Sequence, residues 1–282
     1  MNEVSVALGR PPGVPVLRED SVPERLPGAL ARGPLVEATA DAVLIRVPLV
    51  GRFLVRGEGP TLVERAAGAT DADLGCFRDG PVAAAAALLR GELPLRAACV
   101  SVAGRTVLLC GPSAAGKSAL AAALAQRGHP VLADAVALIS TGPGEGPPTV
   151  TPVAPEPVLW PDTAAELGLL GKPARPVRQA LVSRAYRLGP DPVAAPVTAV
   201  VALRTNPARP RASLDPLVGA AKLPTLLALR WHARLVGPLG LDDAHFAVLT
   251  RLAAETDCVQ LVRPRSGAPA TALAELVEGL MS

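Results

Sequence analysis

The chain has 282 residues, half of them hydrophobic and only 2% aromatic, with 26 glycines and 31 prolines. This glycine and proline content is below that of disordered or low-complexity chains, and the length suffices for one large or two small domains. The net charge is only +3 and no basic stripe is visible, which argues against a nucleic-acid-binding protein. Of the 28 basic residues, only Lys117, Lys172 and Lys222 are lysine, so each retained lysine is of interest.

The first third of the chain predicts a small β-rich region. Residues 1–38 are rich in proline and lack periodicity, which indicates a loosely packed lead-in. Short apolar runs then predict strands at 43–47, 52–56 and 61–64. An acidic linker at 71–79 follows, and then an Ala/Leu helix at 81–90 with proline near its start and Gly91 after its end. We therefore predict an N-terminal region with a linker helix over residues 39–92.

The remaining residues, 93–282, mix strands with helices and predict an α/β domain with a mixed sheet. Two strand-like runs at 99–103 and 106–110, joined by Gly104 and Arg105, indicate a β-hairpin. A Gly-rich loop and a helix at 117–127 come next, and residues 141–148 read as an exposed loop. Further periodic runs predict strands at 131–133, 136–140, 149–153, 158–160, 180–183, 197–203 and 258–262, and helices at 219–236, 242–255 and 270–280.

The sequence also bears on the cellular compartment. Residues 1–10 lack the pattern of a signal peptide, and the longest apolar runs fall well short of the about 20 residues that a membrane-spanning helix needs. The four cysteines are widely spaced, without a C-x-x-C pair, so we expect free thiols and no zinc site or disulfide framework. We predict a cytoplasmic protein with no membrane partner.

One motif carries the chemistry. Its residues match G-x-x-x-x-G-K-[ST], the phosphate-binding loop, and the predicted nucleotide-binding residues are Gly111, Pro112, Ser113, Ala114, Ala115, Gly116, Lys117, Ser118 and Ala119. The glycines let the backbone curl around phosphates, Lys117 offers a cation to the β- and γ-phosphates, and Ser118 offers a hydroxyl to Mg²⁺. The composition of the chain gives about 0.002 chance matches, so nucleotide binding is the firmest prediction.

The loop alone does not name the reaction. Many small-metabolite kinases place it near the N-terminus, whereas 110 residues precede it here. A later apolar strand ending in Asp-Glu, which nucleic-acid and transport ATPases need, is not evident, and neither is a guanine-reading Asn-Lys-x-Asp.

Residues 99–140 resemble the C-terminal catalytic domain of HPr kinase/phosphorylase and its relatives. The resemblance rests on the strand 106–110, the loop 111–118, and the run from Gln126 to Val136, which contains Arg-Gly-His, a short apolar strand and Asp134. The Leu-Trp-Pro-Asp run at 159–162 and the β-rich region at 42–66 are more similar to a branch of HPr-kinase-like proteins found with lasso-peptide biosynthesis. The resemblance is good over about forty residues and thin elsewhere.

The resemblance implies transfer of the ATP γ-phosphoryl group to a serine or threonine hydroxyl of a peptide or small protein, such as a ribosomal precursor peptide. It implies catalytic roles for Lys117 and Asp134, with Ser118 and Asp134 on Mg²⁺. Two positions depart from the family pattern. The second residue of its Asp-Asp pair, usually the base, is Ala135, and the histidine fifteen residues before the first loop glycine is Arg96.

Several other residues are candidates with structural alternatives. We expect His129, His232 and His245 to be structural, Trp160 to anchor the core, and Asp162 to cap a helix as readily as to bind Mg²⁺. Glu156 is a weaker metal candidate. A basic segment is read as a solvated surface or as a phosphate or acidic-peptide site; its residues are Lys172, Arg175, Arg178, Arg184 and Arg187.

The sequence therefore predicts an ATP- and Mg²⁺-dependent kinase of the HPr-kinase type, with a phosphate-loop domain at 93–282. The alternatives are a catalytically degenerate nucleotide-binding interaction protein and a small-metabolite kinase. The acceptor, the choice of ATP over GTP and the oligomeric state stay open, a homo-oligomer included.

Overall fold

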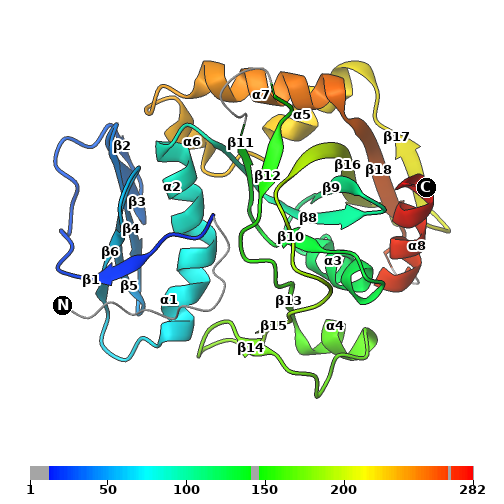
Figure 1. Cartoon of the computed structure of the whole chain (residues 1–282), viewed down its shortest axis with the longest axis horizontal. Helices are drawn as coiled ribbons and strands as arrows, with labels where there is room; N and C mark the ends of the chain where they lie inside the picture. The colour runs from blue at the N-terminus through cyan, green and yellow to red at the C-terminus, as the bar shows by residue number, and fades with distance from the viewer. Residues whose placement is uncertain (1–12, 141–145, 266–267, 282) are drawn as a thin grey trace.

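The structure is a computed structural model that describes residues 13–140, 146–265 and 268–281 (Figure 1). The first twelve residues of the predicted lead-in and most of the predicted loop at 141–148 lie outside this part of the chain. Two β-sheets are separated by a layer of helices, and further helices cover the second sheet (Figure 1). The mixed α/β architecture agrees with the prediction.

The first sheet contains six strands in the order β1-β6-β5-β4-β3-β2. They are β1 (Leu17–Glu19), β2 (Ala31–Arg32), β3 (Val36–Ala38), β4 (Ala42–Val47), β5 (Gly51–Arg56) and β6 (Thr61–Arg65). Neighbours are antiparallel except β1, which runs parallel to β6. The first three strands lie in the segment that the sequence predicts to be loosely packed. Because β1 pairs with a strand about forty residues further along, no local pattern reveals it.

A buried carboxylate fastens this sheet to the loop before it. Glu37 on β3 is fully buried, and its carboxylate lies 2.8 Å from the guanidinium of Arg25, 2.9 Å from that of Arg46 and 3.4 Å from that of Arg32. The backbone N–H of Leu26 also donates to it, at 2.7 Å. This N–H and the arginines together hold the pKa of Glu37 at about 2, below its usual 4.5.

Because the pKa of Glu37 is depressed on folding, its contribution to stability is complete above about pH 4.5 and is lost as the pH falls through about 2. We expect Glu37→Gln to lower the free energy of unfolding near neutral pH and to weaken its decline between about pH 5 and about pH 3. Urea unfolding at those pH values tests this. Glu58→Gln, which alters an exposed carboxylate, is the matched control, and an unchanged pH dependence in Glu37→Gln would contradict the prediction.

The middle layer is helical where the sequence suggests an acidic linker, so that prediction is wrong. It comprises α1 (Asp71–Phe77), a π-helical turn (Arg78–Val82) and α2 (Ala83–Leu89). A capping box starts α1: the Thr70 hydroxyl accepts from the N–H of Asp73, and the Asp73 carboxylate accepts from the N–H of Thr70. The run of alanines in α2 is buried between the two sheets, so the 39–92 region and the 93–282 region share one hydrophobic core (Figure 1).

The second sheet is mixed, as predicted. Its strands are β7 (Leu93–Leu95), β8 (Ala97–Val102), β9 (Arg105–Cys110), β10 (Val131–Ala133), β11 (Ala137–Ser140), β12 (Thr149–Thr151), β16 (Ala195–Thr205), β17 (Ser213–Pro216) and β18 (Asp257–Arg263). β9, β16 and β18 are parallel, and the other pairs are antiparallel. The predicted β8–β9 hairpin is present, with Ala103 and Gly104 in its turn, both at positive φ.

Helices cover both faces of this sheet. On one face lie α3 (Lys117–Gln126) and α8 (Ala270–Met281), and on the other lie α5 (Lys222–Leu227), α6 (Ala233–Val236) and α7 (Asp242–Glu255). The helix predicted at 219–236 is therefore broken, with His232 at φ 44° between α5 and α6. A small sheet of β13 (Val158–Leu159), β14 (Arg175–Pro176) and β15 (Arg184–Ala185) lies beside α4 (Pro161–Glu166). The strand expected at 180–183 is absent; β15 begins one residue later.

Two sequence features find structural explanations. The four cysteines are free; Cys99, Cys110 and Cys258 are buried and Cys76 is half-buried. Lys222 donates to the carbonyls of Ala253 at 2.9 Å and Thr256 at 3.0 Å, and thus caps the end of α7. Across the described ranges, every helix is too short or too polar to cross a bilayer.

Candidate active site

The predicted nucleotide-binding residues form one continuous turn between β9 and α3. Gly111 has φ 143°, and a Cβ there would lie 2.8 Å from the carbonyl oxygen of Leu203 on β16. Gly116, at φ 98°, is the N-cap of α3. The turn therefore needs glycine at both positions, and it directs the positive end of α3 into the space above the sheet. Ala115 is buried beneath the turn, and the other loop residues line a cleft.

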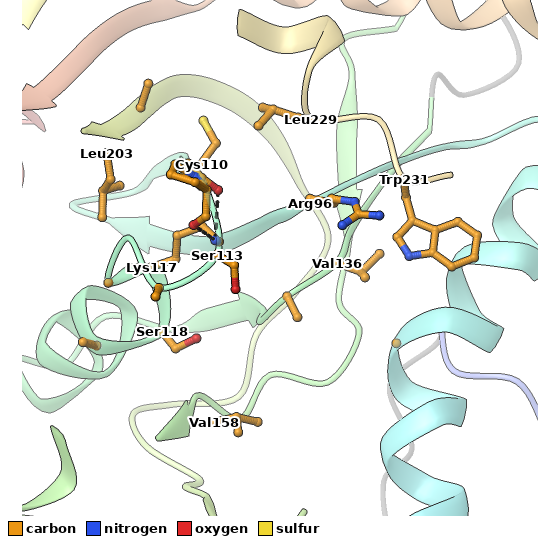
Figure 2. A pocket seen from close by; sticks show the side chains of 18 of the residues that line it. Arg96, Cys110, Ser113, Lys117, Ser118, Val136, Val158, Leu203, Leu229 and Trp231 are labelled. Atoms are coloured by element: carbon orange, nitrogen blue, oxygen red, sulfur yellow. Dashed lines mark hydrogen bonds between the residues drawn. The ribbon is translucent and has the colours of Figure 1, made fainter. Parts of the chain in front are cut away.

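Lys117 is folded back onto its own loop. Its ammonium group donates to the carbonyl of Gly111 at 3.0 Å and to that of Pro112 at 3.0 Å (Figure 2). Partial burial lowers the pKa of Lys117, and the negative charge of Asp134 opposes this shift. A phosphate placed in the turn would replace the two carbonyls as the partner of this ammonium.

Asp134 lies directly beneath the first turn of α3. The Ser118 hydroxyl lies 2.9 Å from Oδ1 and 3.0 Å from Oδ2 of this carboxylate and donates to it. The N–H of Val158 donates to Oδ2 at 2.9 Å. Only 6% of the residue is exposed, and burial raises the pKa of its carboxyl against the lowering effect of these donors. A hydroxyl oxygen and a carboxylate thus lie side by side. Mg²⁺ binds oxygen ligands of this kind.

The cleft above these residues has a volume of about 1430 Å³ and lies at the carboxyl ends of β9 and β16. Open α/β sheets bind ligands at this edge. The phosphate loop forms one side. The opposite side comes from the N-terminal region, through Phe77 and Pro81 in the helical layer, and from the segment that carries Leu229 and Trp231. That the N-terminal region contributes to the cleft was not foreseen from the sequence, because the packing of α1 against the second half of the chain is not local.

Ala135 and Arg96, which the sequence analysis singled out, both line this cleft. Ala135 is exposed, lines the cleft and has φ 72°, a left-handed conformation unusual for alanine. Arg96 lies just before β8 and also lines the cleft. Since Ala97 pairs with Cys110, the next step of the hairpin register brings Arg96 opposite Gly111. The predicted hairpin did not contain this signal: its turn at Gly104 and Arg105 would place residue 98 opposite Gly111, whereas the observed turn at Ala103 and Gly104 shifts the pairing by two residues.

The remaining candidates divide between structural positions and the cleft wall. His129 contacts Glu278 on α8 at 2.8 Å, and His245 contacts the carbonyl of Glu92 at 3.0 Å, so both fit the structural role predicted for them. His232 instead lines the cleft, where its ring packs edge-on against Trp231 with 3.9 Å between centroids.

Two predictions near α4 are wrong. Trp160 is 55% exposed and lines the cleft, so it does not anchor the core. It is also the N-cap residue of α4, which begins at Pro161, so Asp162 lies within the first turn and is not the cap. The helix starts two residues earlier than expected, because Pro161 suits the first helical position.

Three of the five residues of the basic segment form ion pairs with acidic side chains. Arg175 pairs with Glu156 at 2.7 Å, and Arg178 lies 3.7 Å from Asp73 and packs over the Phe77 ring. Arg187 pairs with Asp191, and Arg184 and Lys172 are exposed. Glu156, a candidate metal ligand, is thus engaged in an ion pair. Within the described ranges, no group of three or more His, Cys, Asp or Glu side chains could hold a metal on its own.

Comparison with known proteins finds no protein-family model and no curated protein that matches this chain. Among solved structures, the chain is similar to the HPr(Ser) kinase/phosphatase from Coxiella burnetii. The two are 14% identical, the match covers 67% of this chain and 87% of that chain, and the TM-score is 0.31. At this level of similarity, the activity of that enzyme does not transfer to this chain.

Proposed function

We propose that this protein is an ATP- and Mg²⁺-dependent kinase that transfers the γ-phosphoryl group to a serine or threonine hydroxyl of a peptide or small protein, in the manner of HPr kinase. One observation carries the proposal: the Gly111–Ser118 turn places Lys117 in the lining of the cleft, while Ser118 contacts the buried Asp134. A merely structural glycine turn needs neither the lysine nor the buried carboxylate.

The loop residues would bind and orient the phosphates. The N–H groups of the turn and the positive end of α3 attract the phosphate oxygens, and Lys117 swings from the carbonyls of Gly111 and Pro112 toward the β- and γ-phosphates. Phosphoryl transfer is mainly positioning and charge neutralisation, so this arrangement supplies most of what the reaction requires.

Ser118 and Asp134 would hold Mg²⁺, together with phosphate oxygens. The ion fits because Mg²⁺ at nucleotide sites usually takes one or two carboxylates and completes its shell with phosphates and water. When bound, it neutralises charge on the phosphates. Both carboxylate oxygens of Asp134 already contact Ser118, and the residue is buried, so a metal-binding role suits it better than proton acceptance from a bulky acceptor.

The second candidate is a nucleotide-binding interaction protein without transferase activity. Ala135 favours it, since the position of the family's catalytic base faces the cleft and carries no polar atom. In a loose transition state, the proton of the acceptor hydroxyl can leave to water. The absence of a catalytic base therefore slows phosphoryl transfer without preventing it.

Binding and transfer can be tested separately. We expect Mg·ATP to raise the melting temperature of the full-length protein more than Mg·AMP does, and peptides containing serine or threonine to gain the mass of a phosphate group after incubation with Mg·ATP. The absence of any shift with ATP would contradict nucleotide binding. A shift without transfer to any peptide would favour the interaction protein, and transfer only to small hydroxylated metabolites would favour a metabolite kinase.

A further inference from the structure

Arg96 is held at the edge of the cleft by main-chain contacts. Its N–H donates to the carbonyl of Leu229 at 2.7 Å, and the N–H of Trp231 donates to the carbonyl of Pro94 at 3.0 Å. These bonds fix residues 94–96 to the segment that precedes α6. The next residue, Ala97, pairs with Cys110, which directly precedes Gly111. Figure 2 shows the guanidinium of Arg96 between the phosphate loop and Trp231.

Arg96 is exposed at the edge of the cleft. Among the described residues, no carboxylate forms an ion pair or hydrogen bond with its side chain, although most arginines of this chain have such a partner. The described lining of the cleft contains three permanent cations, Arg96, Lys117 and Arg204, and one carboxylate, Asp162. Arg96 is close enough to lower the pKa of both Lys117 and His232. Among the described lining residues, cations therefore outnumber carboxylates.

The surroundings of Arg96 differ from those of the loop. Trp231 lies beyond Arg96 as seen from the loop, and Val136 and Leu229 lie nearby (Figure 2). Phe77 and Pro81 also line this cleft. These walls are apolar, and an anion that pairs with a guanidinium against such walls interacts more strongly than it would in water. A polyphosphate in the loop already has Lys117 and the loop N–H groups as partners, and Mg²⁺ held by Ser118 and Asp134 would supply a further one, which leaves Arg96 for a different group.

We propose that Arg96 and these apolar walls form a second anion-binding position, which receives a carboxylate or phosphate group carried by the acceptor. This inference rests on the proposed function and names the acceptor class: a molecule with an apolar part and an anionic group near its hydroxyl. A basic peptide would meet the positive charge of Arg96, with which no carboxylate of the described residues forms an ion pair. Arg96 is thus a specificity residue, distinct from the residues that hold the nucleotide.

The test uses full-length protein saturated with Mg²⁺ and AMP-PNP, so that the loop is filled. Phenyl phosphate, benzoate and benzylamine are then titrated by calorimetry. We expect the two anionic probes to bind and benzylamine not to bind, and we expect Arg96→Gln to weaken the anions at least tenfold because it removes a charge-assisted hydrogen bond. Arg204→Gln, which removes another exposed cation of the same cleft, is the matched control and should leave these affinities unchanged. Comparing phenyl phosphate with benzoate tells which oxyanion the position prefers.

Two results would overturn the inference. If each of phenyl phosphate and benzoate binds Arg96→Gln as tightly as it binds wild type, then Arg96 binds no acceptor anion. A loss of affinity for AMP-PNP relative to ADP in Arg96→Gln would assign the residue to the nucleotide. If wild type fails to bind Mg·AMP-PNP, the proposed function fails, and phenyl phosphate titrated into nucleotide-free protein still decides the anion position: weaker binding in Arg96→Gln supports it, and unchanged binding refutes it.

Discussion

Lys117→Ala is expected to abolish the stabilisation of this protein by Mg·ATP. At a nucleotide concentration of about 100 times Kd, a bound ligand adds about 2.7 kcal/mol to the free energy of unfolding. For a chain of this size that corresponds to a rise in melting temperature of about 5 to 10 °C. The variant loses the only loop cation, so we expect the rise to fall to within error at the same concentration. Differential scanning calorimetry with and without Mg·ATP measures both values.

Lys172→Ala is the matched control, since Lys172 is an exposed lysine outside the cleft. It should retain the whole ATP-dependent rise. Lys117 also donates to the carbonyls of Gly111 and Pro112 in the nucleotide-free protein, so its removal should lower the melting temperature of that form slightly. A variant that still gains stability from Mg·ATP would show that the nucleotide does not use this loop.

The phosphate loop could be predicted from the sequence because its requirements are local. Gly111 and Gly116 both adopt positive φ, and Lys117 and Ser118 open the following helix, so eight consecutive residues specify the turn. Asp134 was predicted only through a family resemblance. Its contact with Ser118 depends on how β10 pairs with β8, which spacing alone does not determine.

The N-terminal region shows where local patterns fail. The capping box of Thr70 and Asp73 was visible in the sequence, but the acidic residues around it suggested a linker. Negative charge at the start of a helix stabilises the helix, so these acidic residues indicate a helix and not a linker. By contrast, the pairing of β1 with β6 and the placement of Phe77 in the cleft wall depend on tertiary packing, and no pattern within those segments indicates either.

Ala135→Asp is expected to accelerate phosphoryl transfer about 100-fold, the lower end of the range for a general base. The position already faces the cleft and directly follows Asp134, so an added carboxylate would lie beside the phosphate loop without any change in the main chain. The left-handed backbone at φ 72° also suits aspartate better than alanine, so the substitution should not destabilise the protein. Transfer is measured as the rate of ADP release in the presence of a serine-containing peptide pool.

Ala135→Asn separates the two effects of that substitution. Asparagine tolerates the same backbone conformation and has nearly the same shape, but it cannot accept the proton of a hydroxyl. We expect Ala135→Asn to match Ala135→Asp in melting temperature and to match wild type in rate. Equal acceleration by both variants would attribute the gain to the backbone and not to a base. A slower Ala135→Asp enzyme would mean that a second carboxylate repels the γ-phosphate more than it helps the acceptor, and that alanine at this position avoids this repulsion.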